Sequence, residues 1–117
     1  MTLPSLSEAE PMTDLVAVVT TTGSRADALR LAHLAVEKRL AACAQVSPIE
    51  SVYVWQGAVQ HEPEYRLVLK TTAARRAALE ATLAQAHPYE VPAILTVPLA
   101  HANRAYADWV RAETTPA

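Results

Sequence analysis

Apolar runs separated by polar turns divide the chain into alternating strands and helices. The β-branched run DLVAVVTT, residues 14–21, predicts a buried strand. The sequence TGS then turns the chain, and Ser24 is placed to cap a helix from Arg25 to about Arg39. One face of this helix is apolar, because Ala28, Leu31, Ala32 and Ala35 recur at helical spacing. Leu34 widens this face.

The middle of the chain has the pattern of a long hairpin. Residues 41–60 are rich in β-branched and aromatic side chains, and Gln56-Gly57 is the natural tip. Pro48 predicts a sheet edge or a bulge, because proline has no N–H to donate to a neighbouring strand. The return strand EYRLVLKTT alternates strictly, with Tyr65, Leu67 and Leu69 on one face and Arg66, Val68 and Lys70 on the other.

A second helix, a fourth strand and a last helix complete the order. The second helix spans about residues 73–86, with Leu79 and Leu83 one turn apart, and Pro88 stops it. AILTVPL, residues 93–99, predicts a strand. A final helix, which Asn103 is placed to cap, carries a packing stripe at positions i, i+3 and i+4, formed by Tyr106, Trp109 and Val110.

This order, βαββαβ plus a C-terminal helix, predicts an α+β fold of the ferredoxin-like, split βαβ type. Both core helices would cover one face of a four-stranded antiparallel sheet. We expect one domain at residues 14–114, between a flexible N-terminal tail at 1–13 and a C-terminal tail at 115–117. In SVYVW both faces of the hairpin are apolar or aromatic, so each face needs cover. A second copy of the chain would supply it, and we expect a homo-oligomer.

Composition narrows the possible partners and the location. The formal net charge of the 117 residues is −2, with no basic run, which disfavours nucleic acid and anionic membrane. No apolar segment has the length of a transmembrane helix, and the acidic start lacks a signal layout, so we expect a cytoplasmic protein. The single cysteine, Cys43, excludes an intrachain disulfide and a Cys-only zinc site.

Four sequence blocks in order carry a family resemblance: RLAACAQV, SVYVWQGAVQHEPEYRLVLKT, AHPYEVPAILTVPL and AYADWV. Together they resemble the divalent-cation tolerance protein family, CutA, over about residues 14–114. The resemblance implies a compact homotrimer with a ferredoxin-like fold that acts in the cytoplasm. It also implies a role in tolerance of copper and other divalent metals and in the response to metal ions. It implies no settled enzymatic reaction and no organic cofactor.

The candidate metal ligands are His87, Glu90 and Glu64. His87 in AHPYEVP offers an imidazole for copper or another divalent cation, with Glu90 as a nearby oxygen ligand. Copper-binding members of the family carry a cysteine where this chain has Thr20 and a second histidine where it has Ala86. The alternative is that AHPYEVP is a stiff helix-to-strand connector. Glu64 has its own alternative, a structural ion pair with either Lys70 or Arg39.

The remaining chemistry-bearing residues receive structural interpretations. Tyr53 and Trp55 are expected to anchor the subunit interface. Cys43 is expected to be a small apolar group, and His61 and Glu62 a solvated loop edge.

The alternative function is a PII-like trimeric signalling or scaffold module that binds a small molecule between subunits. The two glycines of the chain provide no Gly-rich phosphate loop for a nucleotide.

Overall fold

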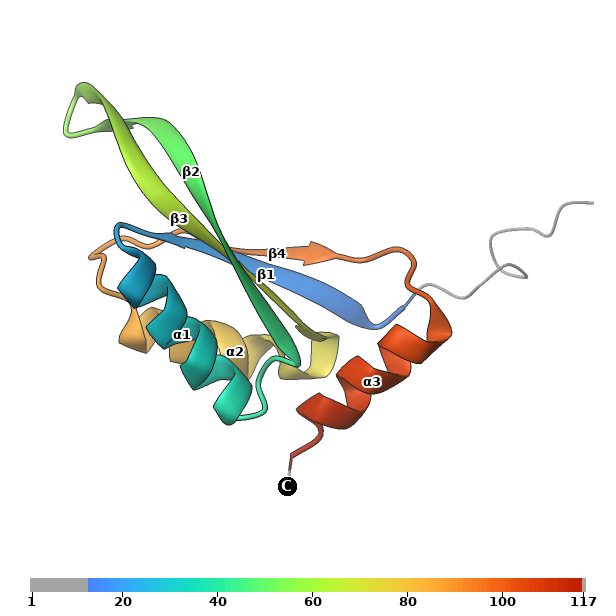
Figure 1. Cartoon of the computed structure of the whole chain (residues 1–117). Helices are drawn as coiled ribbons and strands as arrows, with labels where there is room; N and C mark the ends of the chain where they lie inside the picture. The colour runs from blue at the N-terminus through green and yellow to red at the C-terminus, as the bar shows by residue number, and fades with distance from the viewer. Residues whose placement is uncertain (1–12, 117) are drawn as a thin grey trace, which may run out of the picture.

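The strands and helices follow one another as the hydrophobic pattern predicts. This computed structural model describes residues 13–116. The elements are β1 (Leu15–Thr22), α1 (Arg25–Glu37), β2 (Cys43–Trp55), β3 (Ala58–Thr72), α2 (Ala73–Ala86), β4 (Ile94–Pro98) and α3 (Arg104–Thr114). All strand pairs are antiparallel, in the order β2-β3-β1-β4 (Figure 1). The α+β fold and its four-stranded antiparallel sheet are confirmed.

The main core lies between one face of the sheet and helices α1 and α2. Val16 and Val18 of β1 and Leu67 and Leu69 of β3 alternate with outward-facing residues, so they share this face. They pack against the predicted helix residues, which are Leu31, Ala32, Ala35, Leu79 and Leu83. Ser24 caps α1 as expected, because its side chain accepts a hydrogen bond from the Asp27 N–H at 3.1 Å.

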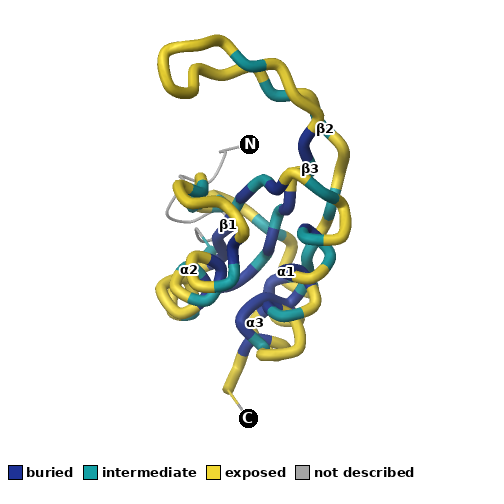
Figure 2. Tube along the Cα trace, turned by 90° about the vertical axis from the view of Figure 1, so that its left-hand side faces the viewer, coloured by how far each residue is buried: buried dark blue, intermediate teal, exposed yellow. Residues whose placement is uncertain are grey.

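Helix α3 packs on a smaller cluster at the end of the sheet remote from the hairpin tip (Figures 1 and 2). Leu15, Ala42, Ala107 and Val110 form its buried part. The predicted stripe of α3 is therefore wrong at Trp109, whose side chain is 43% exposed. Trp109 instead lies against Tyr106, with ring centroids 5.7 Å apart.

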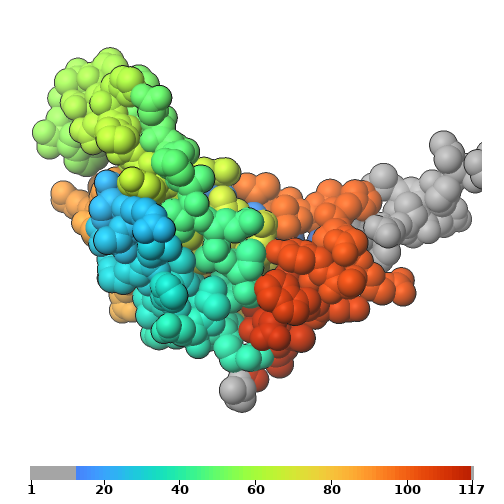
Figure 3. Space-filling model, viewed as in Figure 1, coloured from blue at the N-terminus to red at the C-terminus, as the bar shows by residue number. Residues whose placement is uncertain are grey.

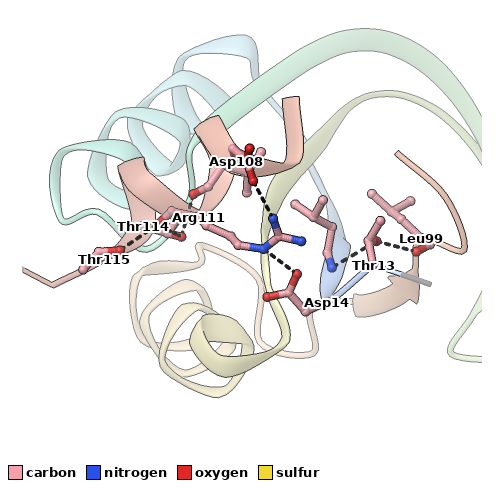
Figure 4. A network of polar contacts seen from close by, with 9 residues as sticks. Thr13, Asp14, Leu99, Asp108, Arg111, Thr114 and Thr115 are labelled. Atoms are coloured by element: carbon pink, nitrogen blue, oxygen red, sulfur yellow. Dashed lines mark hydrogen bonds and ion pairs between the residues drawn. The ribbon is translucent and has the colours of Figure 1, made fainter. Parts of the chain in front are cut away.

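Polar contacts tie both ends of the domain to this smaller cluster. Arg111 donates to Asp14 at 2.8 Å and to Asp108 at 3.0 Å, which links α3 to the start of β1 (Figure 4). The Thr13 hydroxyl donates to the Leu99 carbonyl oxygen at 2.8 Å. Asn103 precedes α3 but makes no side-chain capping bond, so the predicted cap is wrong in that respect. Apart from Thr13, the N-terminal tail predicted at residues 1–13 lies outside the described residues.

The outer half of the β2–β3 hairpin, Ile49 to Glu64, projects beyond the rest of the sheet, and we call it the arm (Figures 1 and 3). Gln56 and Gly57 form its tip with φ angles of 50° and 79°, the left-handed values that a type I′ turn needs. Most of the arm is exposed (Figure 2). His61 lies inside β3, and so does its neighbour Glu62, which corrects the expected loop edge.

The register of the arm gives it two different faces. Tyr53 and Trp55 share one face with Glu62 and Glu64, because Tyr53 pairs with Gln60 and Ile49 with Glu64. The other face carries valines that are 67–73% exposed, namely Val52, Val54 and Val59. Pro48 lies in β2, an edge strand of the sheet, as predicted. In the described residues, no helix is long and apolar enough to cross a membrane.

Candidate functional site

The HPY turn, residues 87–93, leads from α2 to β4 and contains the sequence HPYEVPA. Helix α2 ends at Ala86, and His87 follows with an extended backbone, φ −70° and ψ 136°. Pro88 explains this end, because the residue before a proline is driven out of helical geometry. Arg30 of α1 donates to the Ala86 carbonyl oxygen at 3.1 Å, which holds the end of α2 against α1.

Both ring nitrogens of His87 already have partners. Nδ1 accepts the backbone N–H of Tyr89 at 3.0 Å, so Nε2 carries the proton. Nε2 then donates to the Thr21 carbonyl oxygen at 2.9 Å and lies 3.0 Å from the hydroxyl of Thr20. The structure therefore brings Thr20 and His87 together, but as a hydrogen-bonded pair that fixes the turn to β1.

Burial keeps His87 neutral. Its side chain is only 8% exposed, and this burial lowers the pKa of the imidazole below its ordinary value. The nearby Arg30 guanidinium lowers this pKa further, whereas the bond to Thr21 and the charges of Asp27 and Glu64 oppose the shift. A neutral ring held at both nitrogens acts as a structural clamp in this conformation.

Tyr89 connects the HPY turn to the sheet. Its ring lies 5.0 Å from the His87 ring, centroid to centroid, and its hydroxyl donates to Glu64 Oε2 at 2.5 Å. Burial and this hydrogen bond raise the pKa of the Tyr89 phenol well above its ordinary value. The predicted ion pair of Glu64 is wrong for both candidate partners, Lys70 and Arg39. Lys70 donates to Gln45, and Arg39 caps the end of α3, while Glu64 accepts from a tyrosine.

A cleft of about 460 Å³ lies between the arm and the HPY turn. Its chemistry comes from three aromatic rings and three carboxylates, on Tyr53, Trp55, Tyr89, Glu62, Glu64 and Glu90. Tyr53 donates to Glu62 at 3.2 Å, as Tyr89 does to Glu64. None of the described residues that line the cleft is basic. The cleft therefore has a negative, partly aromatic lining.

The candidate ligands divide between two places. Glu64 and Glu90 both line the cleft, whereas His87 is not in its lining and bonds to β1 through Nε2 and to the Tyr89 N–H through Nδ1. Within residues 13–116, no three His, Cys, Asp or Glu side chains gather closely enough to hold one metal ion. The residues present thus do not fit a tight copper site in a single chain, which takes about four soft or borderline ligands.

Tyr53 and Trp55, predicted as interface anchors, line this cleft and are 38% and 46% exposed. Their role in an interface stays a prediction.

The sequence interpretation missed Glu62, which was assigned to a loop. Counting residue pairs back from the Gln56-Gly57 tip would have found it, because Ser51 pairs with Glu62 on the face that carries Tyr53. Cys43 is half-buried and accepts a weak hydrogen bond from the Tyr106 hydroxyl at 3.7 Å.

Comparison with known proteins gives consistent results over nearly the whole described chain. A family model described as CutA1 divalent ion tolerance protein matches residues 16–113. The divalent-cation tolerance protein CutA of Thermus thermophilus is 41% identical over 98 residues, covering 83% of this chain and 95% of the relative. The CutA protein of Escherichia coli is 36% identical over 108 residues, covering 92% and 96%. The solved structure of CutA from Synechococcus elongatus superposes with a TM-score of 0.87 at 38% identity, covering 90% of this chain and 94% of that one.

Proposed function

Because the chain belongs to the CutA1 divalent ion tolerance protein family, we propose that it acts in the tolerance of divalent cations, copper among them, as a homotrimer. The observation that supports direct contact with cations is the carboxylate-lined cleft between the arm and the HPY turn, which has no basic residue in its described lining. Such a concave surface concentrates cations near its carboxylates.

The chemistry of the cleft favours weak binding through oxygen. Glu64 and Glu90 offer carboxylate oxygens, the ligands that hard divalent cations prefer, and such cations retain several waters when one or two carboxylates hold them. His87 is excluded from this role in the clamped conformation, because each ring nitrogen is in a hydrogen bond. Copper binding through His87 would need the HPY turn to open, or ligands from another chain.

The trimer rests on the apolar surface that a single chain leaves open. Val52, Val54 and Val59 on the arm are 67%, 69% and 73% exposed, and Leu95 and Val97 on β4 are 61% and 49% exposed. Apolar patches of this kind are typical of assembly surfaces. Light scattering at micromolar concentration should give a mass of about 38 kDa, three times the chain mass of 12.6 kDa. A mass of one chain would refute the assembly.

Calorimetric titration of metal-free protein tests direct binding. Mg²⁺ probes the carboxylates, and Cu(II), or Cu(I) under reduction, probes the histidine. We expect weak binding that falls in Glu64→Gln and Glu90→Gln and is unchanged in His87→Asn, which keeps a hydrogen-bond acceptor near the Nδ1 position. Tight copper binding that His87→Asn abolishes would refute the assignment to the carboxylates. No binding of any of these cations by the assembled protein would refute direct binding.

Growth tests the tolerance role separately from binding. Deletion of the gene should lower the copper concentration at which growth stops, and both the wild-type chain and His87→Asn should restore it. Unchanged growth in the deletion strain would refute the role.

The cytoplasmic location stays a prediction, which fractionation would test. The absence of an enzymatic activity also stays a prediction. The PII-like alternative gains no support from the comparisons.

A further inference from the structure

Glu64 is a largely buried carboxylate that has no basic partner among residues 13–116. The residue is 8% exposed, and Tyr89 is the donor to its Oε2 atom. Its other oxygen, Oε1, has no hydrogen-bond partner among the described residues but is not closed off from water, and neither oxygen has an ion-pair partner there. An ionised carboxylate removed from water is unfavourable unless a positive group or several donors face it. Glu64 therefore offers a free carboxylate oxygen to a positive group that enters the cleft.

The walls around this carboxylate are aromatic and apolar. Tyr53, Trp55 and Tyr89 line the cleft and are 38%, 46% and 36% exposed in the single chain, so the cleft of one chain has aromatic walls. Aromatic rings attract cations positioned over their faces, and an alkyl or quaternary ammonium gains from both the ring and the carboxylate. Val91 and Ala93 add apolar surface on the side of the HPY turn.

The size of the cleft distinguishes between kinds of cation. Its volume of about 460 Å³ is within the range of pockets that take small organic ligands, and it far exceeds the space of one metal ion. The carboxylates of Glu62, Glu64 and Glu90 are also too dispersed to surround a single ion. The cleft thus combines dispersed negative charge with aromatic walls. This lining is complementary to a ligand that carries a positive group on an apolar body.

We propose that the cleft between the arm and the HPY turn binds a small organic cation, an amine whose ammonium group pairs with Glu64 and whose apolar body lies against Tyr53 and Trp55. This site does not depend on metal binding, because it uses one charged oxygen and ring faces in place of a coordination shell. It gives the buried charge of Glu64 a partner that the described chain lacks.

Phenethylamine, an ammonium ion at pH 7.5, is the probe, with 2-phenylethanol as its neutral and 3-phenylpropionate as its anionic counterpart. Each is titrated calorimetrically into the full-length protein with EDTA present, so the result does not depend on metal. We expect the amine to bind at least about tenfold more tightly than either counterpart, since only the ammonium group can form a charge-assisted hydrogen bond with Glu64. Equal binding of the neutral compound, or no binding of the amine, would overturn the proposal.

Two variants locate the site, and one control matches them. Glu64→Gln keeps an acceptor for Tyr89 and removes the charge, so the affinity for phenethylamine should fall about tenfold. Trp55→Ala keeps all three carboxylates and should reduce the affinity severalfold. Glu37→Gln makes the same chemical change on an exposed face of α1 and should leave the affinity unchanged. An amine that binds Glu64→Gln as tightly as wild type would overturn the proposal, and so would a basic side chain of a second copy found in the cleft.

Discussion

Replacing Tyr89 with phenylalanine tests whether the HPY turn is held to the sheet through Glu64. The change removes the hydroxyl that donates to Glu64 Oε2 at 2.5 Å and leaves a carboxylate, 8% exposed, without that donor. A hydrogen bond to a charged group contributes about 1.5–3 kcal/mol. Because Tyr89 is itself 36% exposed, water replaces part of the lost bond, and we expect the lower end, about 1.5 kcal/mol.

Urea unfolding followed by circular dichroism measures this loss, at one fixed protein concentration because assembly contributes to stability. The control is Tyr65→Phe, whose hydroxyl has no side-chain partner among the described residues, and it should change the free energy of unfolding little. A double-mutant cycle with Glu64→Gln isolates the contact, and we expect a coupling of about 1 kcal/mol. A loss below about 0.5 kcal/mol, or changes that simply add, would refute the view that this contact anchors the turn.

The same contact predicts an alkaline limit to stability. Burial and the bond to Glu64 raise the pKa of Tyr89 in the folded state, so the folded protein holds this proton more tightly than the unfolded chain. The stabilisation is therefore complete below pH 10 and declines as the pH rises beyond it. Tyr89→Phe should remove this part of the alkaline decline, which urea titrations at pH 8 to 11 would measure.

Three further predictions concern His87, the two glycines and the ion pairs of α3. The lowered pKa of His87 means that the unfolded chain takes up a proton first, so the free energy of unfolding should fall as the pH drops below about 6.5, with a shallower fall in His87→Asn. Gly23→Ala would place a Cβ atom 3.3 Å from the Tyr89 hydroxyl and should weaken the hydrogen bond from Tyr89 to Glu64. Gly57→Ala has no neighbour within 4 Å, but its φ of 79° is unfavourable for alanine, so the free energy of unfolding should fall by about 1 kcal/mol. Both are read by urea unfolding. Arg111→Met removes ion pairs on a side chain 43% exposed and should cost less than about 1 kcal/mol, a difference that 1 M salt should abolish.

The sequence predicted the fold well because its local signals agree with the tertiary structure. Strict alternation around Leu67 and Leu69, and helical spacing around Leu79 and Leu83, each specify one buried face. Pro88 ends α2, and Ser24 begins α1, through backbone rules that need no distant partner. In these elements the local preference and the packing require the same conformation.

The site was less predictable because its contacts join residues far apart in the chain. The bond from Tyr89 to Glu64 crosses 25 positions, and the pair of Thr20 and His87 crosses 67. Residue types alone suggested His87 as a ligand, but its availability depends on which atoms its two nitrogens meet. Trp109 shows the same limit on α3, where helical spacing matched a packing stripe that the folded chain leaves exposed.

The two-residue tip of the arm has a consequence for how this hairpin can change length. Strand side chains alternate with a period of two, so inserting one residue beside Gly57 would reverse the faces of every position on one strand. The carboxylates of Glu62 and Glu64 would then point to the side of Val52 and Val54, and Glu90 would be the one carboxylate left in the described lining of the cleft. Insertions and deletions in the arm should therefore be tolerated in matched pairs across both strands, which lengthen or shorten the hairpin but preserve its two faces.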